Sequence, residues 1–358
     1  MRAIIGGGLL LVLGACSATA ERSAAPPAPP AGASRIASAN IPPVLAARSV
    51  ELPGAKGPVS LDLIAYDRAH GRVWVPVGDT GSVDVFDIGS SAFKRVDGFE
   101  TTQREMRGEM RTMGPSSATI GDGVAYVGNR ATSEVCAIDA QSLQRGNCLK
   151  LATPADFVTY VAATKEVWVT TPRDGSLTLL DASTPAALKS KLVIKMPGSP
   201  EGSAVDADHK LFFTNLEDTN QTLVVDIESH AITATWSSGC SVAPHGIAVD
   251  PARGLVIVAC SDGLRILDAA HDGALLGKLD AGDGVDDIFY DAAKRLVYVA
   301  AANAKRLTIA SIGDNGEATV IATAATAERA RNAVADTDGN TFIADAATAR
   351  LLIFAAPK

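Results

Sequence analysis

The sequence has few aromatic residues, no excess of positive charge and no long apolar run. Only 5% of its 358 residues are aromatic, and the net charge is −8. An acidic chain has no electrostatic reason to bind phosphate backbones, so nucleic acid is not an expected partner. The longest apolar run, residues 3–13, is too short to span a bilayer. With 47% apolar residues, the chain can still bury a large core.

The sequence also lacks the short motifs of common enzymes and metal sites. It contains no CxxC, HExxH or GxSxG motif, and no GxGxxG after a strand. These absences give no support to a thioredoxin-like, zinc-protease or serine-hydrolase function. They favour a binding or scaffolding role over catalysis.

The N-terminus is typical of an exported lipoprotein. Arg2 precedes the apolar run, and residues 13–16 (LGAC) resemble the bacterial lipobox, in which the cysteine is lipidated. Ordinary cleavage after Ala20 is the alternative. We therefore predict a signal peptide over 1–15, lipidation of Cys16, an Ala/Pro/Ser-rich tether over 16–44 and a folded domain over 45–358. Ser17 after the cysteine favours attachment to the outer membrane, on the periplasmic side.

One pattern recurs along the folded part: three short apolar strands joined by turns rich in Asp, Gly and Asn. The third strands end at seven positions spaced by 42–45 residues, apart from one interval of 52. Repeats of this length with several short strands are typical of β-propeller blades. We predict an all-β, seven-bladed propeller of four-stranded antiparallel blades. The last repeat has three strands, and residues 49–52 are expected to supply the fourth.

The repeats YVGNRATSEVCAID (126–139) and WVTTPRDGSLTLLD (168–181) resemble those of the bacterial YncE-like, YVTN-type propellers. PHGIAVDP (244–251) is also similar to blades of related NHL-type and YVTN-type proteins. The resemblance covers roughly residues 48–357. It implies a seven-bladed propeller and export, and it implies no particular ligand, because such propellers serve many roles.

Ionisable residues recur at one position of the repeats, five residues before the Asp that ends the first strand. In a propeller this position converges on the mouth of the central tunnel. The sequence therefore predicts a polar ring there, to which blade three adds the nearest candidate. Its members are Asp62, Asp156, Glu201, His245, Asp286 and Arg331.

Three uses of this ring are open, beside the possibility that its side chains only hydrogen-bond water and each other. Glu201, Asp286 and His245 could ligate a divalent cation. Arg331 could clamp a carboxylate or phosphate of a small polar ligand. Clustered carboxylates could instead prepare a general acid. Glu201-Gly202 resembles the Glu-Gly of metal-dependent lactonase propellers, which implies a gluconolactonase-type hydrolase as the alternative function.

The interval of 52 marks an insertion over residues 101–115, on the same face as the ring. Its methionines Met106, Met110 and Met113 have the spacing of one side of a helical turn. They could bind Cu(I), form an adaptable apolar contact, or pack the loop onto the blade.

Beyond Cys16 there are four cysteines, an even number that suggests two disulfides in an oxidising compartment. Of the three possible pairings we favour Cys136–Cys148 and Cys240–Cys260. The principal hypothesis is an envelope-facing scaffold that binds a small polar ligand or an envelope protein. It contacts the membrane only through the N-terminal lipid and works as a monomer, because a closed ring needs no partner for stability. A pure protein-interaction platform is the third hypothesis.

Overall fold

The computed structural model describes residues 43–106 and 108–358. The predicted signal peptide, the lipidation site Cys16 and nearly all of the predicted tether lie outside these residues. None of the helices in the described part of the chain is long and apolar enough to cross a membrane.

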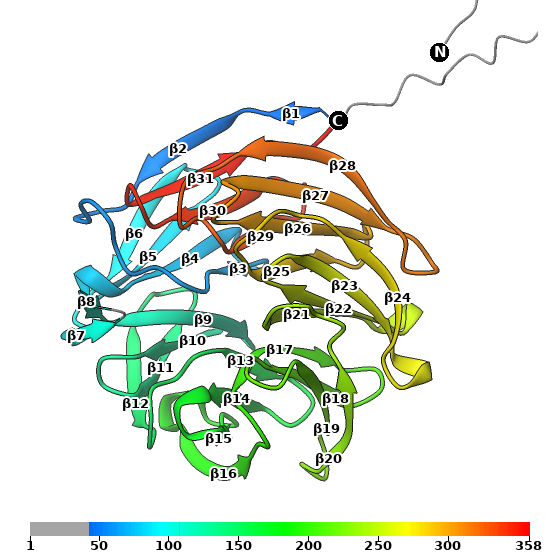
Figure 1. Ribbon diagram of the computed structural model, residues 1–358. Helices are drawn as coiled ribbons and strands as arrows, with labels where there is room; N and C mark the ends of the chain where they lie inside the picture. The colour runs from blue at the N-terminus through cyan, green and yellow to red at the C-terminus, as the bar shows by residue number, and fades with distance from the viewer. Residues whose placement is uncertain (1–42, 107) are drawn as a thin grey trace, which may run out of the picture. The chain divides into compact units, whose positions relative to one another are not determined.

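The described chain forms a ring of seven antiparallel blades, and each blade is built from four consecutive strands or their equivalent (Figure 1). This confirms the predicted fold class. The first three blades are blade 1, with β3 (Ala65–Asp67), β4 (Arg72–Val77), β5 (Ser82–Asp87) and β6 (Ala92–Val96); blade 2, with β9 (Pro115–Gly121), β10 (Val124–Asn129), β11 (Glu134–Asp139) and β12 (Arg145–Lys150); and blade 3, with β13 (Val158–Val161), β14 (Glu166–Thr171), β15 (Ser176–Asp181) and β16 (Lys189–Lys195).

The remaining blades follow the same order, and the last one lacks an outer strand of its own. They are blade 4, with β17 (Pro200–Asp206), β18 (Leu211–Leu216), β19 (Gln221–Asp226) and β20 (Ile232–Ser237); blade 5, with β21 (Pro244–Asp250), β22 (Leu255–Cys260), β23 (Gly263–Asp268) and β24 (Ala274–Leu279); blade 6, with β25 (Val285–Asp291), β26 (Leu296–Ala301), β27 (Arg306–Ile312) and β28 (Ala318–Ala325); and blade 7, with β29 (Ala333–Ala335), β30 (Thr341–Asp345) and β31 (Arg350–Phe354).

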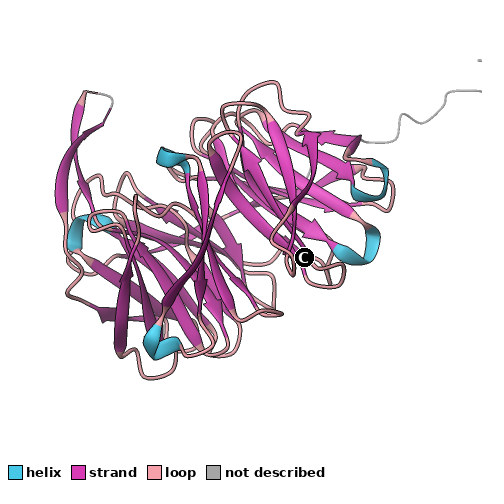
Figure 2. Ribbon diagram, turned by 90° about the horizontal axis from the view of Figure 1, so that it is seen from below, coloured by secondary structure: helices cyan, strands magenta, loops and turns pink. Residues whose placement is uncertain are grey.

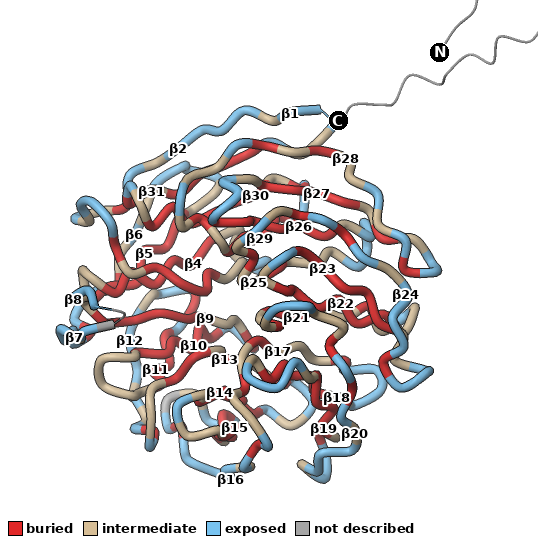
Figure 3. Tube along the Cα trace, in the orientation of Figure 1, coloured by how far each residue is buried: buried red, intermediate tan, exposed pale blue. Residues whose placement is uncertain are grey.

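The core lies between the blades rather than inside one sheet. The second and third strands are buried on both faces, while the outer strands β12, β16 and β20 are largely exposed (Figure 3). Trp168 of blade 3 packs against Phe212 of blade 4, with ring centroids 4.5 Å apart. Because a single four-stranded sheet cannot bury both faces, each blade depends on its two neighbours.

The N-terminal segment closes the ring, as predicted. Strand β2 (Ala47–Glu51) pairs antiparallel with β31 and becomes the outer strand of blade 7. The preceding strand β1 (Val44–Leu45) pairs parallel with β28 and adds a fifth strand to blade 6. Strand β1 was not predicted, because two residues are too few to show a strand pattern in a sequence.

Both favoured disulfides are present, Cys136–Cys148 and Cys240–Cys260. The first joins directly opposed residues of β11 and β12. The second joins the segment before β21 to the last residue of β22. Each disulfide therefore joins two strands of one blade, or a strand to the segment that leads into the same blade.

The prediction of a helical turn for the methionine-containing insertion is wrong. The insertion forms a hairpin of β7 (Thr102–Met106) and β8 (Glu109–Met113), which stands out from the ring (Figure 2). Side chains alternate between the two sides of a strand, so Met110 and Met113 face opposite ways. Met110 is 63% exposed and Met113 is buried. These two thioethers therefore do not share one face, and nothing in their geometry supports a Cu(I) site.

Candidate functional site

A pocket of about 430 Å³ lies where the inner ends of the blades converge, and we call it the mouth pocket. All six residues of the predicted polar ring line it. The structure therefore brings together side chains that are as much as 269 positions apart in sequence. The sequence-predicted lining residues are Asp62, Asp156, Glu201, His245, Asp286 and Arg331; the others with ionisable or bulky side chains are Arg104, Glu105, Met113, Arg130, Phe157, Arg173 and Glu217.

The same backbone irregularity positions the ring residues of blades 4, 5 and 6. The innermost strands β17, β21 and β25 each shift register with the next strand after their first residue. In each case two residues then oppose one, which is a β-bulge, and a bulge redirects the side chains that it contains. The first residue of the bulge is Glu201 in blade 4, His245 in blade 5 and Asp286 in blade 6. Counting five residues back from the Asp at the end of the first strand therefore reaches the first residue of the bulge in all three blades.

Glycines let the bulged segments of neighbouring blades approach each other. A Cβ atom on Gly202 would lie 2.5 Å from the backbone oxygen of His245, and one on Gly246 would lie 2.7 Å from Cα of Asp287. No real Cβ tolerates such a distance to backbone, so only glycine fits at these two positions. The close packing brings the side chains of Glu201, His245 and Asp286 around one opening.

Two arginines organise the carboxylates of blades 1, 3 and 6. Nη1 of Arg130 lies 2.6 Å from Oδ2 of Asp62, and its Nη2 pairs with Asp156. Nη2 of Arg331 donates to Oδ1 of Asp62 at 2.8 Å, and its Nε lies 3.3 Å from Asp286. Asp62 is only 6% exposed, and its carboxylate lies between the guanidinium groups of Arg130 and Arg331.

The charges of this network shift the pKa values of its members in opposite directions. Burial favours the neutral form of Asp62, but the charges of Arg331 and Arg130 outweigh burial and hold its pKa below the ordinary value. Burial raises the pKa of Asp286, and the charge of Asp62 adds to this although Arg331 opposes it. The charges of Asp286 and Asp62 raise the pKa of Arg331, so this side chain stays cationic.

Glu201 forms no ion pair with a cation among the described residues and behaves differently. Burial, the negative charges of Glu217 and Asp286, and a hydrogen bond with Glu217 raise the pKa of Glu201 to about 8. At neutral pH this carboxyl group is therefore mostly protonated. It presents a neutral donor beside two acceptors.

The raised pKa of Glu201 predicts a pH-dependent contribution to stability. The ordinary pKa of 4.5 applies in the unfolded chain, so between this value and about 8 the folded state holds a proton that the unfolded state has lost. This contribution is complete below pH 4.5 and disappears as the pH rises through about 8. We expect Glu201→Gln, which stays neutral, to lose less stability than the parent between pH 5 and 9 in urea unfolding. Equal losses would contradict this, and Glu228→Gln, at an exposed ion pair with Lys210, is the control.

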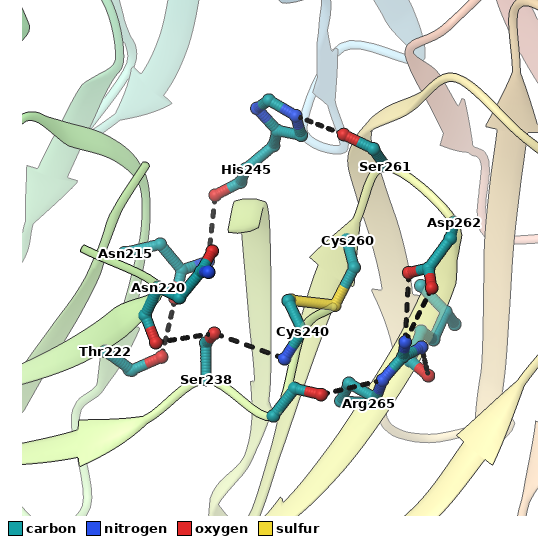
Figure 4. The surroundings of a disulfide bond; sticks show 12 residues. Asn215, Asn220, Thr222, Ser238, Cys240, His245, Cys260, Ser261, Asp262 and Arg265 are labelled. Carbon is teal, nitrogen blue, oxygen red and sulfur yellow. Dashed lines mark hydrogen bonds and ion pairs between the residues drawn. A yellow bond between two sulfur atoms is a disulfide. The ribbon is translucent and has the colours of Figure 1, made fainter. Parts of the chain in front are cut away.

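His245 is held from both ends. Its Nε2 lies 2.9 Å from Oγ of Ser261, and Asn215 donates to its backbone oxygen at 2.8 Å (Figure 4). Ser261 directly follows Cys260, whose disulfide ties the segment before His245 to the end of β22. The disulfide therefore fixes the backbone on both sides of the hydrogen bond that orients the imidazole.

Sequence reasoning missed a second set of functional positions, directly after the second strand of a blade. Arg130 follows β10, Glu217 follows β18 and Ser261 follows β22. The first two line the mouth pocket, and the third orients His245. The signal was present in the repeats, because aligning the ends of the second strands brings these three polar residues to one position.

The geometry gives no support to the predicted cation site at Glu201, Asp286 and His245. A metal site needs at least three ligand atoms close together. Among the described residues, such a group of His, Cys, Asp or Glu ligand atoms, all within 4.8 Å of one another, is formed by Glu134, Cys136 and Cys148. The two cysteines of this group form a disulfide. The guanidinium group of Arg331 already lies against Asp286. The cation site and the lactonase-type hydrolase that depends on it remain predictions.

Comparisons with known proteins identify the fold. No protein-family model matches the sequence, and no curated protein sequence matches it. Solved structures match over almost their whole length. A chain in the crystal structure of the mitotic checkpoint complex is 15% identical with a TM-score of 0.73, over 94% of this chain and 99% of that one.

Two further structures are similar to a comparable degree. A chain of Kuenenia stuttgartiensis hydrazine synthase is 12% identical with a TM-score of 0.68, over 86% of this chain and 100% of that one. The structure of U3-55K is 9% identical with a TM-score of 0.69, over 88% and 99%. Proteins as different as these, at such low identity, show a shared propeller fold and no shared function.

Proposed function

We propose that this protein binds a small polar ligand in the mouth pocket. The observation that carries the proposal is the chain of ion pairs Asp156–Arg130–Asp62–Arg331–Asp286, which holds side chains of five segments in place around one cavity. Charged groups that are already paired and oriented lose little entropy when a ligand adds to them. A concave site with a few convergent polar groups is the usual form of a small-molecule site.

We also propose where the propeller works. The lipobox-like LGAC at residues 13–16 and the Ala/Pro/Ser-rich segment after it support export and lipid anchoring on the periplasmic side of the outer membrane. The two disulfides are consistent with an oxidising compartment. Membership of the YncE-like, YVTN-type group is part of this proposal, on the strength of the repeat motifs.

Binding at the mouth pocket predicts that Arg331 controls affinity. We expect at least one class in a panel of organic acids, amino acids, amines and sugars to raise the thermal unfolding temperature. Arg331→Gln should weaken that ligand tenfold or more, because it removes the charged donor that faces the cavity. Isothermal titration calorimetry measures both affinities.

The control is Arg295→Gln, which alters an exposed ion pair with Asp314 on the outside of blade 6 and should leave affinity unchanged. The proposal is contradicted if no panel member binds. It is equally contradicted if a ligand binds the parent and Arg331→Gln alike.

A further inference from the structure

The arginines around the mouth pocket are sorted by position in the ring, whereas carboxyl groups line the pocket on both sides. All four arginines among the described lining residues come from one side, which runs from blade 7 through blade 1, the β7–β8 hairpin and blade 2 to blade 3, and we call this side the arginine arc. Arg331 precedes β29 of blade 7, Arg104 lies on β7 between blades 1 and 2, Arg130 follows β10 of blade 2, and Arg173 lies in the short helix Pro172–Asp174 of blade 3.

The opposite side of the pocket is acidic. Blades 4, 5 and 6 contribute Glu201, Glu217, His245 and Asp286, with no arginine or lysine among the described lining residues. We call this side the acidic arc. A ligand in the pocket therefore lies in an electric field that runs across the ring from one arc to the other.

The two arcs differ in which charges are already satisfied. Asp62 and Asp156 lie within the arginine arc and are paired there with Arg130 and Arg331, while Glu105 is the third carboxylate on this side. The side chains of Arg104 and Arg173 form no hydrogen bond or ion pair with any described residue. The arginine arc thus keeps two free guanidinium groups for an anionic group of a ligand.

The acidic arc keeps free carboxyl groups in the same way. Glu201 contacts Glu217 rather than a cation, and Glu217 has no cationic partner among the described residues. Asp286 reaches a single guanidinium nitrogen, at 3.3 Å. Glu217 therefore lacks a balancing positive charge, and Glu201 is neutral only while it keeps its proton. A ligand ammonium group beside these two side chains would supply the positive charge.

We propose that the mouth pocket binds an amino-carboxylate, an amino acid or a short peptide with free ends, with its ammonium group on the acidic arc and its carboxylate on the arginine arc. This inference rests on the proposed function and names its ligand class. A simple anion leaves the acidic arc unbalanced, and a simple amine leaves Arg104 and Arg173 without a partner. A ligand with both charges satisfies both arcs at once.

The proton on Glu201 supports this assignment and provides a signature for it. The pKa of Glu201 is raised by burial and by the negative charges of Glu217, Asp286 and Asp62. The cation that interacts with Glu201 is Arg331, and His245 lies on the neighbouring blade. An ammonium group placed beside Glu201 favours its ionised form. Binding near pH 7 should therefore release a proton.

Three tripeptide probes that differ only at their ends test the assignment. Triglycine carries both charges, N-acetyltriglycine lacks the ammonium group and triglycinamide lacks the carboxylate. We expect calorimetry at pH 7 to give triglycine a Kd at least tenfold lower than either capped probe. In buffers of different ionisation enthalpy, triglycine should release a proton on binding and N-acetyltriglycine should not.

Two variants assign the ends to the arcs. Glu217→Gln should weaken triglycine tenfold and leave N-acetyltriglycine unchanged, while Arg173→Gln should weaken triglycine and leave triglycinamide unchanged. Glu228→Gln and Arg295→Gln, at exposed ion pairs outside the pocket, are the matched controls. Thermal unfolding of each variant checks that the fold is intact.

The outcomes separate this inference from the proposed function. Equal affinity for the three probes, or binding of none of them, overturns the amino-carboxylate assignment. If another ligand class then binds in an Arg331-dependent way, the mouth pocket remains a ligand site with a different specificity. If nothing binds in that way, both the assignment and the proposed function are wrong.

Discussion

A chain that begins at Pro53 is expected not to fold into a closed propeller. It lacks β2, whose five residues pair along the whole of β31, and it also lacks β1 beside β28. Without β2 the apolar strand β31 becomes an exposed edge, and exposed edges of this kind pair with other chains. Because each blade is buried by its neighbours, an open ring exposes core on two blades at once.

The matched control for this truncation is a chain that begins at Pro43, which keeps both strands. We expect this control to unfold cooperatively in a thermal scan and to elute as a single species in size exclusion. The Pro53 chain should aggregate or lose its unfolding transition. A Pro53 chain with the same transition temperature as the control would show that the N-terminal strand does not hold the ring shut.

Asp62→Ala is expected to destabilise the propeller by about 3 kcal/mol, the typical cost of removing one partner of a buried ion pair. Asp62 is 6% exposed and is the only acid that contacts both Arg130 and Arg331 among the described residues. Its removal leaves the partly buried guanidinium groups of Arg130 and Arg331 with one carboxylate each. Urea unfolding at pH 7 measures the change in unfolding free energy.

The control for Asp62→Ala is Glu328→Ala, since Glu328 is 69% exposed and pairs with the exposed Lys305. A surface pair of this kind contributes less than about 1 kcal/mol. A loss of similar size in the two variants would mean that the ion-pair chain of the mouth pocket does not organise the inner ends of the blades.

The blade number and the closing strand were predictable because they depend on local patterns that repeat. Strand alternation, Asp-containing turns and a constant period are visible in a single sequence. The hairpin β7–β8 was not, because its methionine spacing also fits one side of a helix and nothing local distinguishes the two. Gly108 in the turn adopts φ near 80°, which glycine accepts readily, but a single glycine in the sequence is equally compatible with the end of a helix.

The candidate site was predictable to the extent that the repeats align. One offset from the first-strand Asp found Glu201, His245 and Asp286, because the same bulge recurs in three blades. This count did not find Arg130, because Arg130 reaches the pocket from the end of a second strand rather than from a first strand. Which arginine pairs with which carboxylate depends on distances across the ring, and these are set only when the ring closes.

The central claim is that the mouth pocket is a ligand site, and soaking crystals of the propeller with a library of small polar fragments tests it most directly. We predict that bound fragments gather in the mouth pocket, against Arg331 and the carboxyl groups of Glu201 and Glu217. Fragments that bind elsewhere on the propeller while the mouth pocket takes up none would contradict the claim.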